Sequence, residues 1–108
     1  MTGERRPPSH YAVILRAARN ALGLRQKQLA NLSDVSAPSI ARIEKGQNVP
    51  RPATWQVLIW VFQKYGIAIE EHNGGDVVIR FNTKDISDFE EERSDDKGRA
   101  SQKESGLD

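Results

Sequence analysis

The pattern of apolar residues predicts a mainly α-helical domain followed by a β-hairpin and an acidic tail. Apolar residues recur with the spacing of amphipathic helices through most of residues 9–66. Two short runs of apolar residues then flank a Gly-rich turn within residues 67–82, which is the pattern of a β-hairpin. In residues 83–108 this patterning is lost among charged and small polar residues, so a disordered tail is expected.

Composition excludes several kinds of functional site. The 108 residues include no cysteine, which rules out disulfides and Cys-based zinc sites. His10 and His72 are too few and too scattered for a metal cluster, so neither a metal nor a cofactor is expected. The sequence also lacks a Gly-rich phosphate loop and any credible Ser, His and Asp arrangement for catalysis. We therefore expect that the protein is not an enzyme.

A net charge of +1 conceals an asymmetry between the two ends of the chain. Residues 1–56 contain nine Lys or Arg against three acidic residues, a balance of +6. Residues 84–108 contain five Lys or Arg against nine acidic residues, a balance of −4. A basic first half is typical of proteins that bind a polyanion.

The chain is expected to begin with a flexible basic arm over residues 1–8 and a helix over residues 9–22. Pro7 and Pro8 stop a helix from running back through the arm, and Gly23 ends the helix. The apolar face of this helix recurs at one helical spacing and is made of Tyr11, Ile14, Leu15, Ala18 and Leu22.

Two short helices joined by a tight turn are predicted next, over residues 26–32 and 37–45. Their inward-facing residues are Leu29, Ala30, Ile40 and Ile43. Ser36 occupies the N-cap position of the second helix, where its hydroxyl can accept a hydrogen bond from a free backbone N–H group. Gly46 ends this helix, because glycine adopts the left-handed conformation at low cost.

This stretch resembles the helix-turn-helix of the lambda repressor/Cro-like (Xre) family of prokaryotic DNA-binding regulators. The resemblance covers roughly residues 11–65 and implies a four-helix DNA-binding domain. It is carried by Gln26, Leu29, Ala30, Val35, Ser36, Ile40, Ile43, Glu44 and Gly46.

Three positions depart from the family pattern. Arg25 stands where Ser or Thr usually caps the first short helix, and Asp34 replaces the usual glycine of the turn. Ala37 stands where a longer polar side chain often contacts a base. Glu44 is expected to have a structural role, bound to the backbone of the motif or to Arg16 or Arg19.

The resemblance implies that the second short helix lies in the major groove of double-stranded DNA. Arg42 is the best candidate for reading a base, because its guanidinium can bind a guanine edge through two hydrogen bonds. Phosphate contacts are expected from the start of the first short helix and from the loop after the second. The full set of expected DNA-binding residues is Gln26, Lys27, Gln28, Ser36, Ala37, Pro38, Ser39, Arg42, Lys45, Asn48 and Arg51.

A further helix over residues 54–65, with Thr54 as its N-cap, is apolar on nearly every side. Because large apolar patches are rare on monomers, it should be covered by the core on one side and by the hairpin, a second subunit or both on the other. A lone two-stranded hairpin is marginal in water, so residues 67–82 should pack on this helix or pair with another copy. The residues expected at a homodimer interface are Trp60, Ile67, Ile69, Val77, Ile79 and Phe81.

Two functions remain open from the sequence. The first is a sequence-specific transcriptional regulator, a repressor or autoregulator, that binds an inverted repeat as a homodimer. The second is an antitoxin or another protein-binding module whose DNA binding is secondary, with the hairpin or the acidic tail as its binding segment. No apolar run reaches the roughly 18 residues of a membrane helix, and no secretory signal is visible, so a cytoplasmic, nucleoid-associated location is expected.

Overall fold

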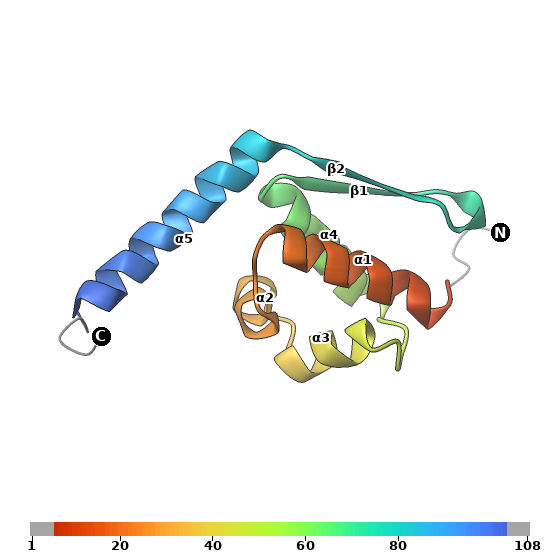
Figure 1. Ribbon diagram of the computed structural model, residues 1–108. Coiled ribbons are helices and arrows are strands. Elements are labelled where there is room, and N and C mark those ends of the chain that lie inside the picture. Colours follow the sequence, from red (N-terminus) through yellow and green to blue (C-terminus); the bar gives the residue numbers. More distant parts are fainter. Residues whose placement is uncertain (1–5, 104–108) are drawn as a thin grey trace.

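Four helices and a β-hairpin surround one hydrophobic core, and a fifth helix leads away from it (Figure 1). The computed structural model describes residues 6–103, with side chains described for residues 6–93. Residues 1–5 of the expected arm and residues 104–108 of the expected tail lie outside this range. The expectation of a mainly α-helical domain with a C-terminal hairpin is confirmed.

Helix α1 (Pro8–Ala21) provides the central face of the core. It begins at Pro8, because a first-turn proline gives up no helical hydrogen bond and has its φ angle already fixed. The chain turns at Gly23, which has a φ angle of 69°. The predicted apolar face is confirmed, since its five residues are all buried, namely Tyr11, Ile14, Leu15, Ala18 and Leu22.

Helices α2 (Gln26–Ser33) and α3 (Ala37–Glu44) form the predicted pair of short helices. Asp34 adopts the left-handed conformation, with a φ angle of 65°, in the tight turn between them. Aspartate tolerates this conformation better than most residues, which explains how the turn forms without the usual glycine. Leu29, Ile40 and Ile43 are buried, as their helical spacing predicts.

Helix α4 (Pro52–Lys64) starts two residues earlier than the sequence analysis expects. Arg51 is its N-cap residue and Pro52 occupies the first turn, so Thr54 lies inside the helix rather than at its cap. One side of α4 enters the core through Trp55, Leu58, Val61 and Phe62. Trp60 lies on the other side, where its side chain is 59% exposed.

Strands β1 (Ile67–Glu71) and β2 (Val77–Phe81) form the predicted antiparallel hairpin. Ile67 pairs with Phe81 and Ile69 pairs with Ile79, so these residues share the face that turns toward the helices. The opposite face carries Ala68, Glu70, Val78 and Arg80. At the start of β1, Gly66 has a φ angle of 107°, and an added Cβ atom would lie 2.9 Å from the Asn82 backbone oxygen.

Helix α5 (Thr83–Lys103) occupies the segment for which the sequence predicts disorder. The side chain of Asn82 accepts a hydrogen bond from Asp85 N at 3.0 Å and so caps the helix. Phe89 is only 6% exposed, and the centroid of its ring lies 4.2 Å from the centroid of the Tyr65 ring. Local capping and the packing of Phe89 on Tyr65 therefore help to order the start of a segment whose overall composition is polar.

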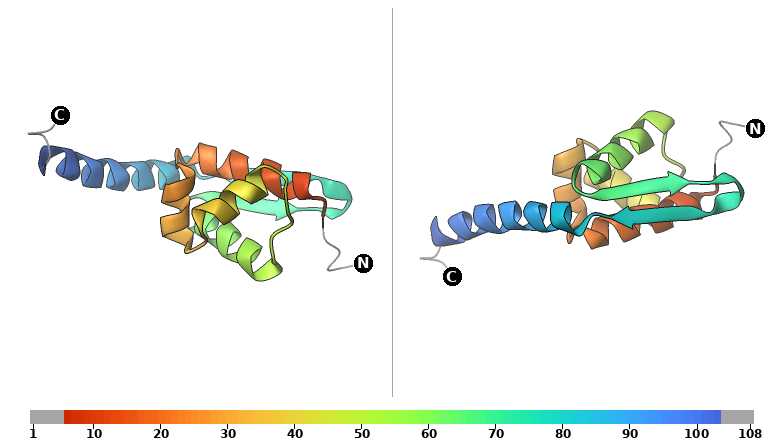
Figure 2. Two further views of the ribbon diagram at one scale, coloured as in Figure 1. Left: turned by 90° about the horizontal axis from the view of Figure 1, so that it is seen from below. Right: turned by 90° about the horizontal axis from the view of Figure 1, so that it is seen from above.

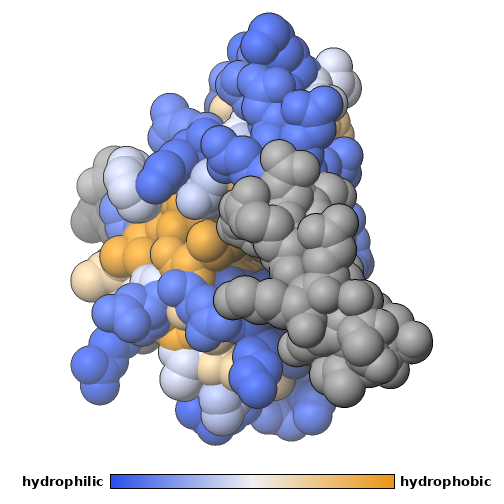
Figure 3. Space-filling model, turned by 90° about the vertical axis from the view of Figure 1, so that its left-hand side faces the viewer, coloured by the Kyte–Doolittle hydropathy of each residue, from blue (hydrophilic) through white to orange (hydrophobic). Residues whose placement is uncertain are grey.

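The hairpin and α3 lie on opposite sides of the helical body, as Figure 1 and the two views of Figure 2 show. Strand β1 packs on α4, and β2 lies over α1. A space-filling view from the side of α5 shows one hydrophobic area surrounded by hydrophilic side chains (Figure 3). Among residues 6–103, no helix is both long enough and apolar enough to cross a lipid bilayer.

Candidate nucleic-acid interface

Helix α3 has one buried side and one open side. Ile40 and Ile43 are buried against the core, and they fix the rotation of the helix about its axis. Pro38 and Arg42 are exposed on the open side, while Ala37 and Ser39 are partly exposed. Arg42 Nη2 lies 3.5 Å from Ser39 Oγ, a long hydrogen bond that leaves the guanidinium available to another partner.

The start of α3 is held by its predicted cap. Ser36 Oγ accepts a hydrogen bond from Ser39 N at 3.2 Å and donates one to Ser39 Oγ at 2.9 Å. Ser36 and Ser39, which could each contact a base or a phosphate, are therefore hydrogen-bonded to each other. This confirms the capping role of Ser36 and fixes the direction in which the first turn of α3 projects.

Glu44 joins the first three helices at the inner side of the motif. Its side chain is 5% exposed and accepts hydrogen bonds from Arg19 Nε at 2.6 Å and Arg19 Nη2 at 2.9 Å. Gln26 Nε2 donates to the same carboxylate at 3.0 Å, and Arg16 donates to the Glu44 backbone oxygen. The hydrogen bond with Glu44 raises the pKa of Arg19, so the Arg19 guanidinium stays charged. Glu44 thus has the expected structural role, because Arg19 binds its carboxylate and Arg16 binds its backbone oxygen.

The start of α2 offers fewer free side-chain groups than its sequence suggests. One amide hydrogen of Gln26 is already used by Glu44, and Gln28 Oε1 accepts a hydrogen bond from Arg25 N at 2.8 Å. Lys27 is fully available, because its side chain is exposed. Arg25 makes no side-chain cap, so the first-turn N–H groups of α2 also remain open to an anion.

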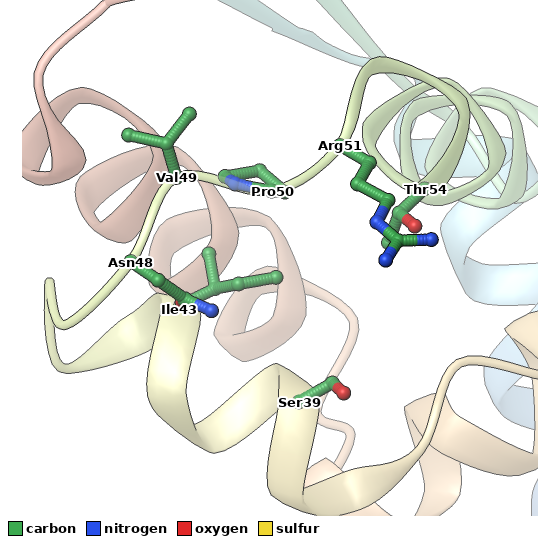
Figure 4. A pocket seen from close by; sticks show the side chains of 7 residues that line it. All are labelled: Ser39, Ile43, Asn48, Val49, Pro50, Arg51 and Thr54. Atoms are coloured by element: carbon green, nitrogen blue, oxygen red, sulfur yellow. The ribbon is translucent and has the colours of Figure 1, made fainter.

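A hollow of about 360 Å³ separates α3 from the start of α4 (Figure 4). Ser39 lies on its α3 side, while Arg51 and Thr54 lie on its α4 side. The remaining lining comes from Ile43, Asn48, Val49 and Pro50. Polar groups from two helices and a loop thus converge on one hollow beside the open side of α3. Lys45 is exposed at the C-terminal end of α3.

Residues 10–62 match the sequence profile of a helix-turn-helix domain family. The chain carries a helix-turn-helix domain. The matched range ends inside α4, so the domain corresponds to the four-helix body without the hairpin or α5. The resemblance to lambda repressor/Cro-like regulators is consistent with this result.

One relative of this chain is a Haemophilus influenzae protein described as an uncharacterized HTH-type transcriptional regulator. The two sequences are 57% identical over 37 residues, which are 34% of this chain. The match spans only 38% of the length of the relative. The match therefore covers about a third of this chain and less than half of the relative.

Thr54 belongs to the helix-turn-helix surface, although it is not among the predicted DNA-binding residues. It is predicted to cap the fourth helix, whereas it lines the hollow together with Ser39 and Arg51. The signal that identifies it is Pro52, since proline favours the first turn of a helix and so places Thr54 within that turn.

The residues expected at a homodimer interface occupy three different environments. Ile67 is completely buried in the core of its own chain, so we correct its expected role and assign it to the core. Ile69, Val77 and Ile79 are partly buried against the core. Trp60 and Phe81 are largely exposed, and they are the members of the set that are free to contact another molecule.

Proposed function

We propose that this protein is a DNA-binding transcriptional regulator, a repressor or autoregulator, that acts as a homodimer on an inverted-repeat operator. The observation that carries the proposal is the orientation of α3. Buried Ile40 and Ile43 hold one side of the helix, and Arg42 is exposed on the other. The second helix of a helix-turn-helix lies in the major groove with its exposed side on the base edges.

The residues around α3 fall into two groups, those proposed to read bases and those proposed to contact phosphates and position the protein on the DNA. Arg42 is the proposed base-reading residue, with Ala37, Pro38 and Ser39 in the same groove. Lys27, Lys45, Asn48 and Arg51 lie on the flanks, where they would contact phosphates and set the register of the protein. Thr54 joins this second set through the hollow it shares with Arg51.

The start of α4 is a favourable place for one of these phosphates. Arg51 provides no side-chain cap for α4, so first-turn N–H groups of the helix are open to an anion. The helix dipole adds partial positive charge at the same end. A phosphate in the hollow would then meet the Arg51 guanidinium, the hydroxyls of Ser39 and Thr54, and the end of a helix.

Selection of bound duplexes from a random DNA pool tests this function. We expect enrichment of an inverted repeat whose half-sites are centred about 34–36 Å apart, one turn of DNA. A reporter placed behind the selected site then measures repression in cells. The Arg42→Ala protein serves as the matched control and should select a less defined sequence. Failure to enrich any duplex at low ionic strength would contradict the proposal.

A further inference from the structure

Strand β2 has one edge that the described residues leave unpaired. Within residues 6–103, the sheet consists of β1 and β2 alone. Asn82 N donates to Gly66 O at 2.8 Å beyond one end of the ladder, and His72 N donates to Asp76 O at 2.8 Å beyond the other. Hydrogen-bonded and non-hydrogen-bonded pairs alternate between these ends. The residues whose backbone N–H and C=O groups point away from β1 are therefore Val77, Ile79 and Phe81.

An apolar groove lies beneath this free edge. Val77 and Ile79 of β2 line it on one side, and Val13 and Ile14 of α1 line it on the other, around a cavity of about 540 Å³. Figure 2 shows β2 lying over α1, the two elements that line this groove. Val13, which lines the groove, is 56% exposed, and Phe81, at the C-terminal end of β2, is 52% exposed. Free backbone groups and an open apolar groove thus occur together along one strand.

Building on the homodimer proposed above, we propose that β2 pairs antiparallel with β2 of a second copy. The pairing is centred on Ile79, and Phe81 of each copy covers the apolar groove of the other. The free edge of β2 fits the same edge of a second copy of this chain, because antiparallel pairing of identical strands presents the same donors and acceptors on both sides. Such an interface is self-complementary about a two-fold axis.

Charge and strand length select this register over its neighbours. A register centred on Arg80 would place the two Arg80 side chains directly opposite each other, which is unfavourable. A register centred on Val78 would leave Phe81 opposite Gly75, beyond the end of β2. When Ile79 is central, Arg80 lies opposite Val78 of the second copy and Phe81 lies opposite Val77 of the second copy. Glu70 Oε2, 3.1 Å from Arg80 Nη2, already balances the Arg80 charge within each copy.

The resulting four-stranded sheet is compatible with DNA binding. The two-fold axis of two antiparallel strands centred on one residue is perpendicular to the sheet. The helices of both copies then lie on the same side of the sheet. Because α3 lies on the side of the body opposite the hairpin, both α3 helices would be directed to one side of the dimer (Figures 1 and 2).

Disulfide crosslinking tests the register directly, because the chain contains no cysteine. Val78→Cys and Arg80→Cys are made as separate single variants, since both residues lie on the solvent-facing side of the hairpin. Oxidation of an equal mixture should give mixed disulfide dimers far faster than oxidation of either variant alone. Gln56→Cys, at an exposed position of α4, is the control for an interface formed by that helix.

Each outcome of this experiment supports or overturns the inference. Crosslinking of Arg80→Cys with itself, or of Gln56→Cys alone, would show a different pairing and overturn it. A dimer in sedimentation experiments that gives no mixed disulfide would overturn this inference and leave the proposed homodimer intact. A monomer at every concentration would overturn both. Loss of DNA binding in a protein that still forms the mixed disulfide would contradict the proposed function alone.

A substitution at Phe81 provides a second test. Phe81→Ser should fold normally, because its side chain is half exposed, and circular dichroism checks this. We expect the Kd of the dimer to rise by about tenfold or more, since aromatic residues that fill a partner's pocket dominate interfaces. Trp60→Ser is the matched control on the exposed side of α4. If Trp60→Ser weakened the dimer and Phe81→Ser did not, the interface would lie on α4 and the inference would fail.

Discussion

Arg42 and Glu44 lie two residues apart on α3 and have opposite environments. Arg42 is exposed and makes one long hydrogen bond, whereas Glu44 is buried and accepts several short ones. Helical spacing explains the difference, because side chains two positions apart on a helix point in different directions. The same short helix therefore presents one charge to solvent and uses another to hold its neighbours.

Replacing Arg42 by alanine should weaken binding to the selected operator by about tenfold to one hundredfold, the value of one well-formed contact to a base pair. The discrimination at one base position should be lost at the same time. Competition between the operator and single-base variants measures both effects. Lys84→Ala on α5 removes the same charge far from α3 and is the control. Equal losses on all sequences would show that Arg42 contacts only phosphate.

Replacing Glu44 by glutamine should lower the free energy of unfolding by about 2 kcal/mol, because it leaves the partly buried charge of Arg19 without its counter-ion. Urea denaturation measures the change. Glu90→Gln, at an exposed position of α5, should change stability by less than about 0.5 kcal/mol. A Glu44→Gln protein as stable as this control would mean that the carboxylate does not hold the three helices together.

At the scale of elements, helices with a strong apolar period are the best-predicted part of the fold. The face of α1 and the inner edge of α3 follow from spacing alone, because burial requires one continuous apolar side. The boundaries of α4 are less well predicted, since the preference of Pro52 for the first turn outweighs the capping tendency of Thr54. The hairpin and its apolar side follow from alternation, but alternation does not reveal whether that side meets the core of its own chain or a second subunit.

The nucleic-acid surface could be anticipated from the sequence only in part. The exposure of Arg42 and the cap formed by Ser36 follow from local spacing. The contact between Gln26 and Glu44 does not, because it joins residues from two helices whose packing is set by the whole core. The hollow shared by Ser39 and Thr54 depends in the same way on how the loop returns the chain to α4.

Helix α5 departs from the sequence expectation because a few contacts outweigh its polar composition. Phe89 packs on Tyr65, Arg93 lies over the Phe89 ring, and Arg93 also donates to the backbone oxygen of Leu22 at 3.4 Å. The contact with Tyr65 connects α5 to the end of α4, and the hydrogen bond to Leu22 connects it to the end of α1. Composition counts the apolar residues in a segment but does not show whether one of them meets a partner.

Replacing Phe89 by alanine should release α5 while leaving the helix-turn-helix domain folded. Removal of a buried aromatic side chain costs about 3 kcal/mol or more, and here the loss falls on one peripheral element. Hydrogen exchange of residues 83–93 should therefore become faster, while exchange in α1 and α3 should change little. Glu91→Ala, at an exposed position of the same helix, is the control. Unchanged exchange in α5 would show that Phe89 does not hold the helix in place.

At the scale of the whole molecule, basic residues are concentrated in the half of the chain that forms the helix-turn-helix domain. Residues 1–56 have a balance of +6, and residues 84–108 have a balance of −4. The described side chains of α5 include several of the acidic residues, and this helix extends away from the body (Figure 1). The protein is therefore close to neutral as a whole but presents a basic surface around α3.

This charge distribution predicts a strong dependence of DNA binding on salt. Each phosphate that a protein cation neutralises releases counter-ions, so the logarithm of the affinity falls with the logarithm of salt concentration by about 0.9 per contact. Arg51→Gln should reduce this slope by about 1 for each bound copy, with a similar loss of affinity on all sequences. Titrations of one operator between low and physiological salt measure the slope. Lys84→Gln on α5 is the charge-matched control and should leave it unchanged. A slope equally sensitive to both substitutions would mean that net charge, rather than the surface beside α3, attracts the DNA.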